Sequence, residues 1–347
     1  MPTIGIFPAS GGLGSSTYTH LLNKVSPSNT VLISRHPDKT PQIYRDQGVQ
    51  LRQASYEASP AELEAAFKDI DVLFLISYPS HVHEYRTSLQ IPALDAAHRA
   101  GVKHIFYSSL AFALPDKDAT LAEVMGAHLD SEAHLRKLAA QDPSFSWTAI
   151  REGLYHESFP IYTAFLDLND PTTTEIRIPH DGSGPGISWA KRDELGEASA
   201  NLIAQYVQDP AAFSWKNKLV ALTGPREWSL ADTVQLLSTV AGRDLQIREV
   251  TVDEYATQPQ VTAKFGSSAL AQTWATAWDA ILAGETSHVS SSLEQLLGRR
   301  PEEFDVTIKN LYQADTVTTT QNTEYQSLRG RQYKKKVLST GVDVAVA

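Results

Sequence analysis

Short apolar runs alternate with helical patterns along the first half of the chain. Apolar runs of strand length begin at Ile4 and cover residues 30–34, 49–54, 72–77, 102–108 and 147–151. Residues 60–68 and 85–100 have helical patterns, the first capped by Ser59 and the second ended by Gly101. Apolar strands separated by amphipathic helices are typical of a parallel sheet that is covered on both faces. The pattern therefore predicts an α/β fold.

The pattern changes after Gly153. Residues 158–187 contain prolines, a run of threonines and a glycine-rich turn, whereas residues 190–208 predict a helix and residues 218–222 a strand. Residues 226–313 are mostly helical, with one strand at 245–250. We expect residues 1–157 and 188–225 to form the sheet domain, and residues 158–187 and 226–313 to form a smaller, mostly helical lobe. Residues 314–347 are rich in Thr, Gln and Asn and then basic, which predicts a disordered tail.

The first apolar run leads directly into a glycine-rich turn and then into a helix. Gly11 and Gly14 occupy the second and third glycine positions of a G-x-G-x-x-G pattern, while Pro8 occupies the first and requires a turn of different construction. Such a turn lets the backbone approach a pyrophosphate, and the N–H groups of the following helix face it. The sequence thus predicts a Rossmann-type doubly wound sheet that binds a dinucleotide, although similar turns occur in proteins that bind none. The expected phosphate-binding residues are Ala9, Ser10, Gly11, Gly12, Leu13 and Gly14.

Arg35 follows the second predicted strand and lies 21 residues after Gly14 (35 − 14 = 21). A carboxylate near this position binds the ribose 2′-hydroxyl of NAD, whereas an arginine accommodates the 2′-phosphate of NADP. Lys39 adds a second positive charge nearby. We therefore expect NADP(H) as the cofactor; the alternative is a solvated basic loop without a ligand.

One predicted helix places polar groups on its inward face. Met125, His128, Glu132, Leu135 and Ala139 recur at spacings of three and four, so they share one side of the helix. His128 and Glu132 can therefore form a hydrogen bond, and His128 could donate a proton to a bound carbonyl. The alternative is a buried polar pair that only fixes the helix.

The same helix lacks the Tyr-x-x-x-Lys pair by which short-chain dehydrogenases oxidise alcohols. His128 stands in place of the tyrosine and Glu132 in place of the lysine. Reversible alcohol oxidation is therefore not expected, and a quinone is a better acceptor because its reduction needs less help from an enzyme acid.

Composition restricts the remaining possibilities. The 347-residue chain is 42% hydrophobic and 20% charged, which is ordinary for a globular protein, and its formal net charge of −10 disfavours nucleic acid or an anionic membrane as a partner. It has no cysteine, which excludes disulfides and thiolate chemistry. It also lacks a membrane-length apolar run and a signal-peptide pattern, so we expect a cytoplasmic protein. His81, His83 and His156 lack metal-like spacing with carboxylates, and no metal is predicted.

Taken together, these segments resemble the NmrA-like group of atypical short-chain dehydrogenases, and within it the NADPH:quinone oxidoreductases. The resemblance extends over about residues 2–313, and Pro8 and Ala133 depart from the group's usual glycine and lysine. The segments that carry it are 9–14, Arg35 with Pro37, 48–56, 75–77, 97–105, 107–110, His128 with Glu132, 148–155, and Arg192 with Asp193.

The resemblance implies a Rossmann sheet domain that binds NADP(H) and a lobe that holds a quinone or another small carbonyl acceptor. It places Arg35 at the 2′-phosphate, Ser77, Tyr78 and Ser108 along the cofactor, and Gly153, Leu154 and Tyr155 beside the nicotinamide. Tyr155 could stack on the acceptor. Two alternatives stay open: an NADP(H)-sensing regulator that grips a protein partner without turnover, and a reductase of specialised-metabolite biosynthesis.

Overall fold

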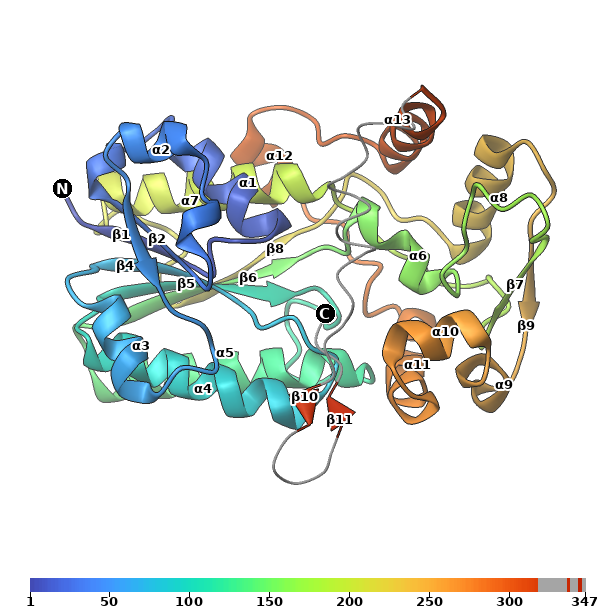
Figure 1. Cartoon of the computed structure of the whole chain (residues 1–347), viewed down its shortest axis with the longest axis horizontal. Helices are drawn as coiled ribbons and strands as arrows, with labels where there is room; N and C mark the ends of the chain where they lie inside the picture. Colours follow the sequence, from blue (N-terminus) through green and yellow to red (C-terminus); the bar gives the residue numbers. More distant parts are fainter. Residues whose placement is uncertain (318–335, 338–342, 345–347) are drawn as a thin grey trace.

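The computed structural model describes residues 1–317, 336–337 and 343–344. A seven-stranded sheet has the order β3-β2-β1-β4-β5-β6-β8, and every neighbouring pair is parallel (Figure 1). This confirms the predicted Rossmann-like α/β fold. The strands are β1 (Ile4–Phe7), β2 (Thr30–Ser34), β3 (Gln50–Gln53), β4 (Val72–Ile76), β5 (His104–Leu110), β6 (Ser146–Glu152) and β8 (Lys218–Leu222).

Successive residues of the central strands point to opposite faces of the sheet. In β4, Val72 and Phe74 belong to the apolar cluster on one face, and Leu73 and Leu75 to the cluster on the other. Both faces are therefore buried, which explains why these strands are almost continuously apolar.

Helices cover the two faces separately (Figure 1). One face carries α1 (Gly12–Leu21), α2 (Gln42–Asp46), α7 (Arg192–Gln208) and α12 (Ser292–Leu297). The other carries α3 (Pro60–Phe67), α4 (His83–Arg99) and α5 (Glu123–Gln141). Short 3-10 helices cover Pro27–Asn29, Pro37–Lys39 and His156–Ser158.

Local signals set several of these boundaries as predicted. Ser59 caps α3 in a reciprocal capping box with Glu62, and β2 and β8 have the predicted bounds. Strand β5 differs, because it starts at His104 instead of residue 102. The Val102 N–H donates to the Ala97 carbonyl, so Val102 belongs to the turn that ends α4.

The smaller lobe lies beyond the carboxyl ends of the strands (Figure 1). It contains α6 (Phe159–Tyr162), β7 (Glu175–Ile178), α8 (Leu230–Ala241), β9 (Gln246–Glu249), α9 (Val252–Ala256), α10 (Pro259–Phe265), α11 (Ser268–Leu282) and α13 (Phe304–Val317). Strand β7, which the sequence did not predict, pairs in parallel with β9 and joins residues 158–187 to residues 226–313.

The predicted tail begins too early, because residues 314–317 continue helix α13. Two short strands, β10 (Lys336–Val337) and β11 (Asp343–Val344), pair antiparallel. The remaining tail residues, with most of the basic run, lie outside the described residues. Within the described ranges, no helix combines the length and the apolar character that crossing a bilayer requires.

Candidate functional site

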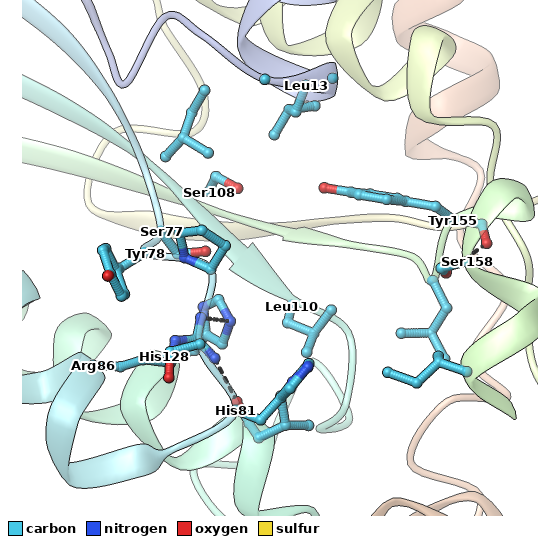
Figure 2. A pocket seen from close by; sticks show the side chains of 18 of the residues that line it. Leu13, Ser77, Tyr78, His81, Arg86, Ser108, Leu110, His128, Tyr155 and Ser158 are labelled. Carbon is cyan, nitrogen blue, oxygen red and sulfur yellow. Dashed lines mark hydrogen bonds between the residues drawn. The ribbon is translucent and has the colours of Figure 1, made fainter. Parts of the chain in front are cut away.

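The direction of the strand order changes between β1 and β4, and open α/β sheets bind ligands at such a switch point, outside the carboxyl ends of the strands. A cavity of about 430 Å³ lies there; we call it the central cavity. Most of the residues predicted to bind the cofactor line it: Ser10, Gly11, Gly12, Leu13, Gly14, Ser77, Tyr78, Ser108, Gly153 and Leu154. Figure 2 shows Leu13, Ser77, Ser108 and Tyr155 around it.

Gly11 and Gly14 of the turn are required for different reasons. Gly11 has a φ of +128°, which side chains other than glycine rarely adopt. A Cβ on Gly14 would lie 2.7 Å from the Pro8 carbonyl oxygen and 2.8 Å from that of Ala9, so only glycine lets α1 start this close to the end of β1. Pro8 itself follows a cis peptide bond and lines the central cavity.

Ala9, Arg35 and Lys39 lie outside the wall of the central cavity. Ala9 is buried, and its N–H donates to the Ile33 carbonyl at 2.8 Å, which joins the turn to β2. Arg35 is exposed and lines a second hollow of about 750 Å³. Lys39 is exposed and lines neither hollow.

His128 lines the central cavity, but the predicted hydrogen bond with Glu132 does not form. The His128 Nε2 atom lies 2.6 Å from an Arg86 nitrogen, and its Nδ1 atom lies 3.1 Å from the Tyr107 hydroxyl. Because a guanidinium only donates, Nε2 accepts and Nδ1 carries the proton. Burial, with the charges of Arg86 and Arg151, lowers the pKa of His128 well below its usual value. His128 is therefore a neutral side chain with both nitrogens occupied.

Glu132 faces away from the central cavity, although it shares a buried helix face with His128. Its carboxylate accepts two bonds from Arg151, Nε to Oε1 at 3.0 Å and an Nη to Oε2 at 2.8 Å, and one from the Ser109 hydroxyl at 2.7 Å. These partners come from β6 and β5. The ion pair therefore replaces the expected His128–Glu132 pair.

Tyr155 projects into the central cavity opposite His128 and Arg86 (Figure 2). Its hydroxyl donates to Glu152 Oε2 at 2.7 Å. Burial raises the pKa of Glu152 to about 8, so this carboxyl group is largely protonated at neutral pH. Burial and the neighbouring Glu152 also raise the pKa of Tyr155 well above its usual value. The two groups together can hold a proton at the cavity wall.

The sequence did not predict several of the residues that line the central cavity. His81 lies just before α4, and Arg86 lies near the start of that helix. Tyr162 and Trp274 come from the smaller lobe. One signal was available for Arg86, since it shares a helical stripe with Gln90, Ala93 and Ala97, all of them buried. No local pattern marks Tyr162 or Trp274, because only the lobe's packing brings them to the cavity.

These additional residues give the cavity an apolar, aromatic end. Leu110, Val124 and Ile161 line it, and the Trp274 ring lies 4.9 Å from His81 and 5.7 Å from Tyr162 between centroids. The phosphate turn and this apolar end therefore belong to one continuous space, which suits a dinucleotide and a flat second ligand side by side. Among the described residues, no cluster of His, Asp or Glu is arranged to hold a metal ion.

Comparison with known proteins identifies the family to which the chain belongs. The sequence model of the NmrA-like family matches residues 2–279. The chain belongs to the NmrA-like family. An NmrA-like family domain-containing oxidoreductase of Aspergillus flavus, flvB, is 28% identical over 296 residues, which cover 84% of this chain and 89% of that protein.

Two solved structures of reductases with bound NADPH or NADP(H) are similar to this chain over most of their length. The NADPH-dependent quinone oxidoreductase of Escherichia coli, complexed with NADPH, is 25% identical with a TM-score of 0.71, over 89% of this chain and 100% of that one. The triphenylmethane reductase of Citrobacter sp., complexed with NADP(H), is 25% identical with a TM-score of 0.68, over 89% and 99%. The chain is thus an NmrA-like family member that is similar in fold to reductases with bound NADPH or NADP(H).

Proposed function

We propose that the protein is an NADPH-dependent reductase that transfers a hydride to a small, flat carbonyl acceptor, most specifically a quinone. The observation that carries the proposal is the central cavity, in which the phosphate turn and an aromatic acceptor wall are continuous. Residues 1–157 and 188–225 would hold the nucleotide. Residues 158–187 and 226–313 would cover the acceptor, because Tyr162 and Trp274 reach the cavity from that lobe.

The residues present fit a dinucleotide. Gly14 makes room that a Cβ would fill, and the N-terminus of α1 points its N–H groups at the turn. The exposed guanidinium of Arg35 would bind the 2′-phosphate. When bound, the nicotinamide supplies the hydride. Relatives that are solved with NADPH or NADP(H) support this choice of cofactor.

We propose that Tyr155 donates the proton that the acceptor needs and that Glu152 supplies a proton to Tyr155 in turn. Reduction of a quinone to a hydroquinone takes up one hydride and one proton, and that proton is needed at an acceptor oxygen at the cavity wall. The Tyr155 hydroxyl lines that wall, and the protonated Glu152 carboxyl beside it can return a proton to the tyrosine. His128 is a weaker candidate as a proton donor, because both of its ring nitrogens already have partners. We propose that it positions Arg86.

The function is tested by mixing the protein with NADPH and a panel of quinones and following the loss of nicotinamide absorbance. We expect quinone-dependent consumption of NADPH, with NADH much less effective. Absence of consumption, together with different affinities for NADP⁺ and NADPH in calorimetry, would favour the sensor instead. Absence of binding of either nucleotide would overturn both functions.

Two substitutions test the proton assignment. Tyr155→Phe is expected to lower kcat by roughly 10²-fold while the Kd for NADPH stays unchanged. Phe keeps the ring and removes only the hydroxyl, which makes it a matched change. His128→Asn should lower kcat less than Tyr155→Phe; a larger loss in His128→Asn would restore the histidine as the proton donor.

A further inference from the structure

Arg86 is a buried cation at the wall of the central cavity. The residue is 4% exposed, and it forms no ion pair with a carboxylate among the residues that the structure describes. One Nη donates to the Val124 carbonyl at 2.9 Å and the other contacts His128 Nε2 at 2.6 Å. A guanidinium has five N–H donors, and the buried Nε has no partner within the described part of the chain.

The surroundings of Arg86 do not neutralise its charge. His128 accepts a hydrogen bond from it but is neutral, and burial together with Arg86 lowers the pKa of His81 to about 4, so this second imidazole is neutral as well. The other nearby groups are the hydroxyls of Tyr56 and Tyr107. An isolated buried charge is costly, and proteins normally pair it. The cavity wall therefore holds a positive charge that lacks a counter-ion.

The other buried arginine of this region behaves differently. Arg151 is 1% exposed, but it is paired with Glu132 and satisfied by three backbone carbonyls, those of Ala113, Leu114 and Lys117. The partners of Arg151 are all groups of the protein itself, so its role is structural. Arg86 differs in lining the cavity and in having no carboxylate.

We propose that Arg86 selects an aromatic acceptor that carries a negative charge, such as a carboxylate, and that the acceptor supplies the missing counter-ion. The inference rests on the proposed reductase function and specifies its substrate class. The aromatic body of the acceptor would pack against Tyr162 and Trp274, while its anionic group would meet the guanidinium beside His128 and His81 (Figure 2). The same charge disfavours a cationic acceptor, because a cation would have to lie beside a second buried cation.

The test compares two ligands of nearly equal shape, 2-naphthoate and 2-naphthamide, which differ in charge. Their binding is measured by calorimetry on the NADP⁺-loaded protein, and their competition with a neutral quinone is measured in turnover. We expect 2-naphthoate to bind at least about ten-fold more tightly than 2-naphthamide. Arg86→Met should bring the two affinities to within about two-fold, and Arg86→Lys, which keeps the charge, should retain part of the preference.

Arg99→Met is the matched control. Arg99 lies on the same helix, is exposed and pairs with Glu64 at the surface, so its loss should leave the preference unchanged. Equal affinity of the two ligands for the unmodified protein would overturn the proposal, as would a preference that persists in Arg86→Met. If Arg86→Met does not fold, the unmodified protein and Arg86→Lys decide the question.

Failure of this inference is distinguishable from failure of the proposed function. A protein that oxidises NADPH with neutral quinones but does not distinguish the two ligands is a reductase without anionic selectivity. A protein that consumes no NADPH but prefers 2-naphthoate, also when free of nucleotide, has the anion site without the reductase activity.

Discussion

Arg151 and Glu132 form a two-point ion pair in the interior of the sheet domain, with side chains that are 1% and 0% exposed. The Arg151 guanidinium also donates to the carbonyls of Leu114 and Lys117, so the pair ties β6 and α5 to the loop that follows β5. That loop is joined to the smaller lobe as well, because the Thr120 hydroxyl and the Leu121 N–H donate to Glu285. The ion pair thus supports one side of the central cavity.

Glu132→Gln is therefore expected to destabilise the fold by about 3–5 kcal/mol, since it leaves the Arg151 charge buried without its partner. Urea unfolding measures the change. Glu64→Gln is the control, because it breaks the exposed pair with Arg99 and should cost less than about 1 kcal/mol. Equal losses of unfolding free energy in the two variants would show that the buried Arg151–Glu132 pair stabilises the fold no more than the exposed pair does.

Gly14→Ala should disrupt the phosphate turn. The added Cβ would lie within 2.8 Å of two backbone carbonyl oxygens, and backbone cannot move aside as a side chain does. We expect about 1–3 kcal/mol of destabilisation and at least a ten-fold loss of NADPH affinity. Thermal unfolding with and without NADPH measures both effects.

Gly12→Ala provides the comparison two residues earlier. The three atoms nearest to its Cβ all belong to the Arg192 guanidinium, the far end of a flexible side chain. This variant should keep most of its stability. A Gly14→Ala protein as stable as Gly12→Ala would contradict the close approach of α1 to the end of β1.

Arg35→Ala should remove the preference for the phosphorylated cofactor. Charge-assisted bonds to a phosphate contribute about 1.5–3 kcal/mol, so the ratio of NADPH to NADH affinity should fall at least about ten-fold. Lys39→Ala should have a smaller effect, because Lys39 lines neither hollow. Calorimetric Kd values for both cofactors test this, and an unchanged ratio in Arg35→Ala would place the 2′-phosphate elsewhere.

Glu152 should make stability fall as the pH rises from about 4.5 toward 8, and turnover fall above about pH 8. Its pKa is about 8 in the folded protein against 4.5 unperturbed, so between these values the folded state retains a proton that the unfolded state has lost. Stability from this group is complete below about pH 4.5 and is lost as the pH rises toward 8, by on the order of 1.4 kcal/mol per pH unit.

Glu152→Gln should flatten that slope in unfolding experiments across this pH range. In the unmodified protein, kcat for quinone reduction should decline above about pH 8, as the proton reserve beside Tyr155 is lost. A variant with the same pH profile as the unmodified protein would show that another group titrates there.

The sequence alone determined the architecture of the sheet domain, because its signals are local. Apolar runs gave the strands, and Ser59 and Gly101 marked helix ends through bonds and conformations within a few residues. The glycine turn was recognisable for the same reason, since its chemistry depends on neighbouring backbone. The family resemblance rests on such segments, and the match over residues 2–279 confirms it.

Only the tertiary structure decided how the buried polar groups are paired. Helix spacing places His128 and Glu132 on one face, but their partners, Arg86 and Arg151, come from α4 and β6 and are distant in sequence. The acceptor wall is likewise non-local, because Tyr162 and Trp274 reach it through the packing of the lobe. A pattern of residue types shows which groups face inward. It does not show which of them meet, because that depends on contacts between segments that the chain brings together only on folding.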